Sequence, residues 1–79
     1  MEKLKVAYDR EADALYVTLR EAPCAYTRSL SELRNVDYSA DGTPIGVELL
    51  RASKGVDLTD VPSAKEIGDA LRDSFSVYA

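Results

Sequence analysis

Residues 35–51, NVDYSADGTPIGVELLR, constrain the fold most because they have the pattern of a β-hairpin. Apolar residues alternate with polar or small ones on both sides of a short polar stretch, and this period of two is typical of half-buried strands. The stretch at 39–42 contains Asp41 and Gly42, which suit a turn because Asp bonds its own backbone and Gly adopts positive φ. We therefore predict two antiparallel strands here, the second over residues 44–50. The alternating apolar positions are Val36, Tyr38, Ile45, Val47 and Leu49.

Two further alternating segments precede this hairpin. Residues 3–8 and 14–19 each place their larger apolar side chains on one face, and the five-residue link between them, 9–13, is too short for a parallel crossover. We predict a second antiparallel hairpin from these two segments. Residues 25–33 alternate more weakly, and Leu33 breaks the parity. The third strand is therefore either long or interrupted, with a bulge or bend near residues 31–34.

The C-terminal part has the pattern of an amphipathic helix over residues 63–75. Ser63 is followed three residues later by Glu66, which matches a capping box, and apolar residues recur at helical spacing. The sequence thus predicts a single domain over residues 1–79, with a sheet part at 1–54, a link at 55–62 and the helix. The expected fold class is α+β: a four-stranded antiparallel β-sheet, arranged as a meander of two hairpins, with one C-terminal α-helix.

Composition excludes several classes of protein. A net charge of −4 over 79 residues argues against a general nucleic-acid binder, which needs a basic surface to meet phosphates. No apolar run approaches the roughly 20 residues that cross a membrane, and the first residues lack the apolar core of a signal peptide. The single cysteine cannot form an internal disulfide. We expect a cytoplasmic protein that binds neither nucleic acid nor membrane.

Two groups of residues resemble the signatures of a known family. The first group is Tyr8-Asp9, followed by residues 12–17 (ADALYV) and Leu19. The second group is Val36-Asp37-Tyr38, Asp41-Gly42, Gly46, Glu48-Leu49-Leu50 and Ala52-Ser53. Together they resemble the domain of unknown function 2283, a family of small bacterial, archaeal and phage proteins. The resemblance implies a small antiparallel sheet domain. It implies no reaction, cofactor or ligand, and it does not extend over the C-terminal helix.

The residues offer little for catalysis. The chain has no histidine, which removes the usual general base near neutral pH and the commonest metal ligand. Cys24 lacks a partner that would activate it, and one Cys without His does not make a zinc site. We therefore predict a protein that is not an enzyme and holds no cofactor.

Acidic residues offer weak candidates for a metal site. In a meander, the links at 9–13 and 39–43 lie at the same end of the sheet, where carboxylates would gather and attract Ca²⁺ or Mg²⁺. The alternative is that Asp is simply a favoured turn residue. In the same meander, four basic residues would gather at the opposite end of the sheet. The acidic candidates are Asp9, Asp13, Asp37 and Asp41, beside Glu11, and the basic residues are Arg20, Arg28, Arg51 and Lys54.

The outward face of the sheet suggests self-association. Tyr16 and Leu50 point away from the main apolar face, and one helix covers only one side of a sheet. Tyrosine is enriched at interfaces, so we expect a homodimer through this face or through exchange of the helix.

Our main hypothesis is a non-enzymatic, self-associating interaction module. One alternative is an antitoxin-like or regulatory protein whose helix grips a partner. Another is a protein that binds a small ligand or divalent ion at the acidic end. The helix positions that would serve as an interface or as anchors are Ala64, Ile67, Leu71 and Phe75.

Overall fold

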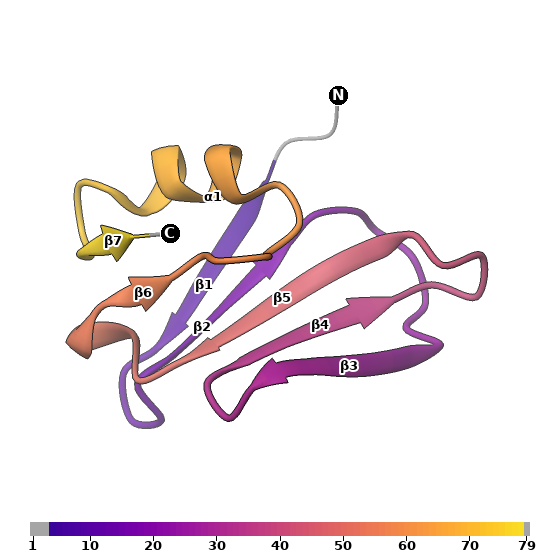
Figure 1. Cartoon of the computed structure of the whole chain (residues 1–79), viewed down its shortest axis with the longest axis horizontal. Helices are drawn as coiled ribbons and strands as arrows, with labels where there is room; N and C mark the ends of the chain where they lie inside the picture. The colour runs from indigo at the N-terminus through magenta and orange to yellow at the C-terminus, as the bar shows by residue number, and fades with distance from the viewer. Residues whose placement is uncertain (1–3, 79) are drawn as a thin grey trace.

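A computed structural model describes residues 4–78, which form a five-stranded antiparallel sheet covered on one face by the C-terminal part of the chain (Figure 1). The predicted α+β class is confirmed. The strand order is β1-β2-β5-β4-β3, and every neighbouring pair is antiparallel. The strands are β1 (Lys5–Asp9), β2 (Ala14–Thr18), β3 (Tyr26–Ser31), β4 (Arg34–Tyr38) and β5 (Pro44–Leu50).

The hairpin predicted over residues 35–51 is confirmed as the pair β4 and β5. Val36 lies opposite Val47, and β5 has the predicted bounds. In the turn, the Ser39 amide donates to the Thr43 carbonyl at 2.9 Å and the Gly42 amide donates to the Ser39 carbonyl at 3.0 Å. Gly42 has a φ of 85°, a conformation that glycine adopts without a Cβ clash. Local turn chemistry and alternation therefore predicted this unit correctly.

The number of strands was predicted wrongly. The expected long or interrupted third strand is in fact two strands, β3 and β4, which pair with each other through a turn at Glu32 and Leu33. A register shift between Ser29 and Ser31 accompanies this hairpin. The parity break at Leu33 marks a reversal of the chain, because a turn moves the following side chains onto a new strand.

The predicted meander order is also wrong, since β2 pairs with β5 and not with the strand that follows it. β5 is the most buried strand, with four of its seven residues buried. It lies at the centre of the sheet, so its backbone pairs with β2 on one side and with β4 on the other. Ala14 lies opposite Leu50, so the β1–β2 turn sits at the C-terminal end of β5. The β4–β5 turn sits at the other end of the sheet.

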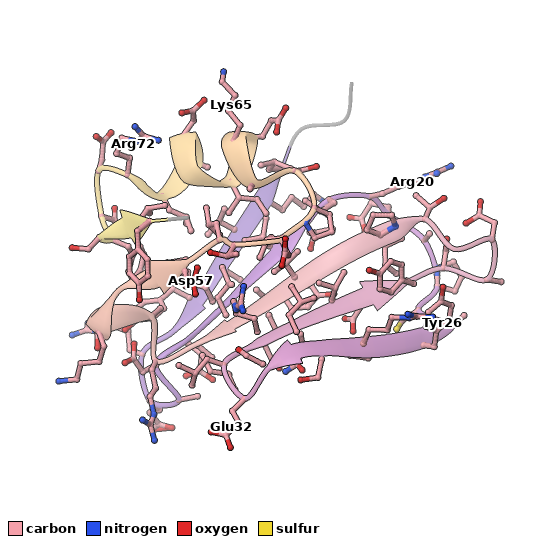
Figure 2. The ribbon with its side chains drawn as sticks, viewed as in Figure 1. Arg20, Tyr26, Glu32, Asp57, Lys65 and Arg72 are labelled. Atoms are coloured by element: carbon pink, nitrogen blue, oxygen red, sulfur yellow. The ribbon has the colours of Figure 1, made fainter. Side chains whose placement is uncertain are left out.

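The covering layer contains more structure than the predicted link and helix. It consists of η1 (Ala52–Lys54), β6 (Val56–Asp57), α1 (Ala64–Leu71) and β7 (Val77–Tyr78). β6 and β7 form a parallel pair, which ties the segment expected to be an irregular link to the end of the chain. The guanidinium of Arg34 donates to the Thr59 carbonyl and so fastens this layer to β4. Lys65 on α1 and Arg72, directly after its end, project away from the sheet (Figure 2).

The helix is shorter than predicted and begins differently. It ends at Leu71 instead of residue 75. Ser63 has a φ of 57° and its side chain makes no capping hydrogen bond, so the predicted capping box with Glu66 is wrong. A serine cap needs an extended backbone to aim its oxygen at the following amides, and the left-handed conformation of Ser63 prevents this.

The core lies between the sheet and the covering layer. Ile67 is 0% exposed and Leu71 is 2% exposed, so α1 packs against its own sheet. Along residues 4–78, no helix is both long and apolar enough to cross a membrane. The buried apolar residues are Leu15, Val17, Val36, Ile45, Val47, Leu49, Ala52, Val56, Leu58, Val61, Ile67 and Leu71.

Candidate functional site

The acidic residues do not gather as expected. Asp9 and Asp13 lie at the β1–β2 turn, whereas Asp37 and Asp41 lie toward the β4–β5 turn at the other end of the sheet. The expected cluster depended on a sheet of four strands, and the additional chain reversal between β3 and β4 moves the turn at residues 39–43 to the other end of the sheet. Over residues 4–78, no group of three or more Cys, Asp or Glu side chains is arranged to hold a metal ion.

The expected basic end is not formed either. Arg51, directly before η1, and Lys54, its last residue, lie at the Asp13 end. The Arg20 amide donates to the Ile45 carbonyl at 3.2 Å, which places Arg20 at the opposite end (Figure 2). The Arg28 guanidinium lies 5.9 Å above the centre of the Tyr26 ring, on β3. Each end of the sheet therefore carries both signs of charge.

Asp13 connects the first hairpin to the covering layer. Its carboxylate accepts hydrogen bonds from the Ser53 amide at 2.9 Å, the Ser53 hydroxyl at 2.6 Å and the Tyr8 hydroxyl at 2.7 Å. Its carbonyl also accepts from the Ala52 amide at 3.0 Å. The hydrogen bonds from Ser53, followed by the one from Tyr8, lower the pKa of Asp13 below its ordinary value. This aspartate fixes the position of η1, which is a structural role.

Asp41 has a comparable local role in the β4–β5 turn. Its carboxylate accepts from the Ser39 hydroxyl and from the Thr43 amide, the latter at 3.0 Å. These bonds lower the pKa of Asp41 to about 2. The turn-residue interpretation of this aspartate is therefore the one that its contacts support.

Tyr16 forms the most specific contact on the sheet face that the covering layer leaves open, here called the open face. Its hydroxyl donates to Asp37 Oδ2 at 2.6 Å, two strands away, so the ring crosses β5. A Cβ added to Gly46 would lie 1.9 Å from the Tyr16 hydroxyl oxygen, so the ring needs a glycine beneath it. Burial and then the bond to Asp37 raise the pKa of the Tyr16 hydroxyl. Sequence reasoning placed Tyr16 on this face but missed both partners, because they come from strands that are distant in the chain.

Other polar side chains of the open face also bond to one another. The Thr27 hydroxyl donates to Asp37 Oδ1 at 2.5 Å, and the Asn35 amide group donates to Glu48 Oε1 at 3.0 Å. Leu50 lies on the same face and is half-buried. This face is therefore polar, with hydrogen bonds running between strands.

The predicted interface residues of the helical segment have different positions. Ile67 and Leu71 are buried in the core of their own chain. Ala64 and Phe75 are half-buried against the same core. Phe75 contacts the ring of Tyr8 edge to face, with 5.1 Å between the centroids.

Strand β1 is the most exposed part of the sheet. All five of its residues are exposed, and it pairs with β2 on one side only. Val6 lies opposite Val17 and Tyr8 opposite Leu15, so both belong to the face that carries the core. They are nevertheless 42% and 39% exposed. An edge strand with apolar side chains in line with the core is a surface suited to pairing with another strand.

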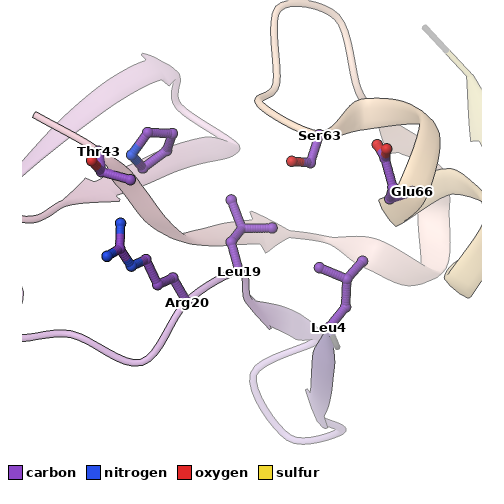
Figure 3. Close-up of a pocket in the computed structure, with 7 residues that line it drawn as sticks. Leu4, Leu19, Arg20, Thr43, Ser63 and Glu66 are labelled. Atoms are coloured by element: carbon purple, nitrogen blue, oxygen red, sulfur yellow. The ribbon is translucent and has the colours of Figure 1, made fainter. Parts of the chain in front are cut away.

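A hollow of about 450 Å³ lies between the start of α1 and the end of the sheet (Figure 3). Its floor is apolar and includes Leu4, Leu19 and Pro44, while Arg20 and Glu66 bring opposite charges to its walls. Cys24 lies elsewhere, in an exposed loop, where its thiol donates to the Tyr26 carbonyl at 3.6 Å.

The fold and these contacts define a small α+β protein in which several aspartates bond to turns and to neighbouring strands. Residues 5–53, more than half of the chain, match the model of a family described as protein of unknown function (DUF2283), and the chain belongs to this family. The predicted resemblance is confirmed. No curated protein and no solved structure matched the chain.

The matched region covers the five-stranded sheet and ends within η1, so it leaves out α1. Its two signature halves pair directly as β2 and β5, and two side chains of the first half also contact the second half. Asp13 from the first half binds Ser53 from the second, and Tyr16 from the first half crosses Gly46 to reach Asp37. These contacts join residues of the two halves that are distant in the chain.

Proposed function

We propose that this protein is a non-enzymatic interaction module that self-associates through the edge strand β1. The observation that carries the proposal is the exposure of Val6 and Tyr8 on the face that carries the core. A second copy that pairs with β1 covers these side chains and continues the sheet. Small domains bury a limited share of their surface alone, so such coverage stabilises them.

The backbone of β1 is available for this pairing. Outside the strand ladders and the helix, none of the backbone hydrogen bonds of residues 4–78 involves residues 5–9. The amide and carbonyl groups on the outer side of β1 therefore remain as donors and acceptors for another strand.

Two other surfaces are less suited to self-association. The second edge strand, β3, has a register shift between Ser29 and Ser31, and such irregularities discourage strand addition. The open face, where Tyr16 and Leu50 were expected to form the interface, carries polar groups that already bond to one another. The proposal therefore moves the interface from the open face to the β1 edge.

The test is the native mass of the protein, measured by native mass spectrometry and sedimentation over a range of concentrations. We expect a dimer that Val6→Lys converts to a monomer of unchanged circular dichroism, because a charge at this edge opposes burial. Leu33→Lys is the matched control, since Leu33 is 41% exposed but lies in the β3–β4 turn. A wild-type protein that is monomeric throughout, or equal effects of both substitutions, would overturn the proposal.

A second candidate function is the binding of a small zwitterion with an apolar body. The hollow in Figure 3 favours it, because Arg20 and Glu66 supply opposite charges beside the floor formed by Leu4 and Leu19. Apolar amino acids at millimolar concentration are suitable probes, with isothermal titration calorimetry as the measurement. Heat of binding that disappears in Arg20→Ala supports this candidate, and no heat with any of these probes contradicts it.

A further inference from the structure

We infer that two copies of this chain pair their β1 strands antiparallel about a two-fold axis at Ala7, which makes one continuous ten-stranded sheet. This inference rests on the self-association proposed above and adds its register and symmetry. It follows from the order of residues in β1, Lys-Val-Ala-Tyr-Asp, read against a second copy of itself.

The charges of β1 are self-complementary in this register. Lys5 and Asp9 lie at the two ends of the strand and on the same face as Ala7. Antiparallel pairing about Ala7 places Lys5 of each copy opposite Asp9 of the other. Opposite charges that face each other across two strands favour a pairing, and like charges disfavour it. The same pair of Lys5 with Asp9 then forms twice, once from each copy, as a two-fold symmetric interface requires.

The apolar residues are complementary in the same register. Val6 of each copy lies opposite Tyr8 of the other, on the face that carries the core, which forms two pairs of an aromatic with a β-branched residue. Tyr8 is already oriented by the edge-to-face contact with Phe75 and by its hydrogen bond to Asp13. Val6 and Tyr8, which a second copy would cover, are therefore both exposed at the edge of the sheet.

Other registers are poorer for geometric reasons. A shift by one residue would place the core-face residues of one copy against the open-face residues of the other. A shift by two residues keeps the faces matched but pairs only three of the five residues of β1. Pairing about Ala7 uses the whole strand and is the register that sets Lys5 against Asp9.

The charged pairs select the register but supply little of the affinity. Lys5 already forms an ion pair with Glu21 at 2.6 Å, and both side chains are 71% exposed. Asp9 Oδ1 accepts from the amides of Glu11 and Ala12, at 3.0 and 3.2 Å. Exposed ion pairs contribute about 0–1 kcal/mol. The affinity comes from the backbone hydrogen bonds and from the covered apolar side chains.

A charge-exchange experiment tests the register. In Lys5→Asp alone, two aspartates face each other at both ends of the interface, and in Asp9→Lys alone, two lysines do. We expect each variant to dimerise at least about tenfold more weakly than the wild type. In a mixture of the two variants, the aspartate introduced at position 5 of one chain faces the lysine introduced at position 9 of the other. At the opposite end of the interface the native Asp9 faces the native Lys5, so the heterodimer should form with wild-type affinity. Glu21→Gln is the control, because it removes the existing partner of Lys5 without changing β1.

Cross-linking tests the same register without relying on charge. In a Cys24→Ser background, Ala7→Cys places two cysteines directly opposite each other, with Cα atoms about 5 Å apart. This distance permits a disulfide, so the dimer should become covalent on mild oxidation. Lys5→Cys is the control, because four residues separate the two copies of position 5, about 13 Å along the strand.

The outcomes separate the two proposals. A wild-type dimer with heterodimer rescue and with cross-linking at position 7 but not at position 5 supports the register. A wild-type dimer without rescue and without cross-linking at position 7 overturns the register and leaves self-association in place. A wild-type protein that is monomeric at all concentrations overturns both.

Discussion

Gly46→Ala provides the sharpest test of the structure, because the Tyr16 ring occupies the place of a side chain at position 46, whereas the backbone conformation of Gly46 does not require glycine. Its φ is not among the positive values of the chain, so alanine fits the backbone of β5. An added Cβ would nevertheless lie 1.9 Å from the Tyr16 hydroxyl oxygen and 2.5 Å from Cζ of the ring. The ring must therefore move and lose its hydrogen bond to Asp37.

The expected cost follows from two opposing contributions. Loss of a hydrogen bond to a charged group costs about 1.5–3 kcal/mol when it is buried, and we take about 1–2 kcal/mol because Tyr16 is only half-buried. Lost contacts between the ring and the backbone add about 1 kcal/mol. Replacing a strand glycine with alanine returns about 0.5–1 kcal/mol of backbone entropy. The net destabilisation should be about 1–2.5 kcal/mol, or roughly 4–20 °C in Tm for a domain of this size.

A double-mutant cycle measures whether Tyr16 is the cause. In a Tyr16→Ala background there is no ring to displace, so Gly46→Ala should be neutral or slightly stabilising. In Tyr16→Phe the ring remains without its hydroxyl, so a cost should persist. Urea denaturation followed by circular dichroism, at one fixed protein concentration, gives the free energies. If Gly46→Ala costs the same with and without the tyrosine ring, the explanation of this glycine is refuted.

Three further predictions concern the core and the dependence of stability on pH. Leu71→Ala should lower the free energy of unfolding by about 2–5 kcal/mol, because the residue is 2% exposed, whereas Lys65→Ala on the outer side of α1 should change it by less than about 0.5 kcal/mol in urea denaturation. Folding holds the pKa of Asp13 below its ordinary value of 3.8, so its contribution is present above pH 4 and is lost as the pH falls. Asp13→Asn should therefore flatten the acid limb of a plot of stability against pH, and an equal flattening in Asp73→Asn would contradict this reasoning. Folding raises the pKa of Tyr16 above its ordinary value of 10.0, so the unfolded chain loses the proton first and stability falls as the pH rises above 10. This fall should be less steep in Tyr16→Phe, measured by thermal unfolding between pH 8 and 11.

Much of the secondary structure could be predicted from local patterns. The alternation around Val47 and the turn at Gly42 specified the hairpin of β4 and β5, because both signals act between neighbours in the chain. The helical spacing of Ile67 and Leu71 identified their buried face correctly. The parity break at Leu33 was noticed, but a bulge, a bend and a tight turn produce the same local signal. The fifth strand was missed for that reason.

The candidate site was less predictable, because it depends on which strands are neighbours. Alternation shows which face a side chain occupies, as it did for Tyr16, but it does not show which strand lies beside it. The acidic cluster failed because of the missed strand: the extra reversal between β3 and β4 puts Asp13 and Asp41 at opposite ends of the sheet, although both lie in turns.

The sequence by itself determined the α+β class, most of the strands, the amphipathic helix and the family signatures, because these are properties of short segments. The tertiary structure alone decided the order β1-β2-β5-β4-β3, the contact between Tyr16 and Asp37, and the exposure of β1 at an edge. The physical reason is that strand order is chosen by the total burial of the sheet. That burial favours the apolar β5 at the centre, and it is a sum over the whole chain that no single segment contains.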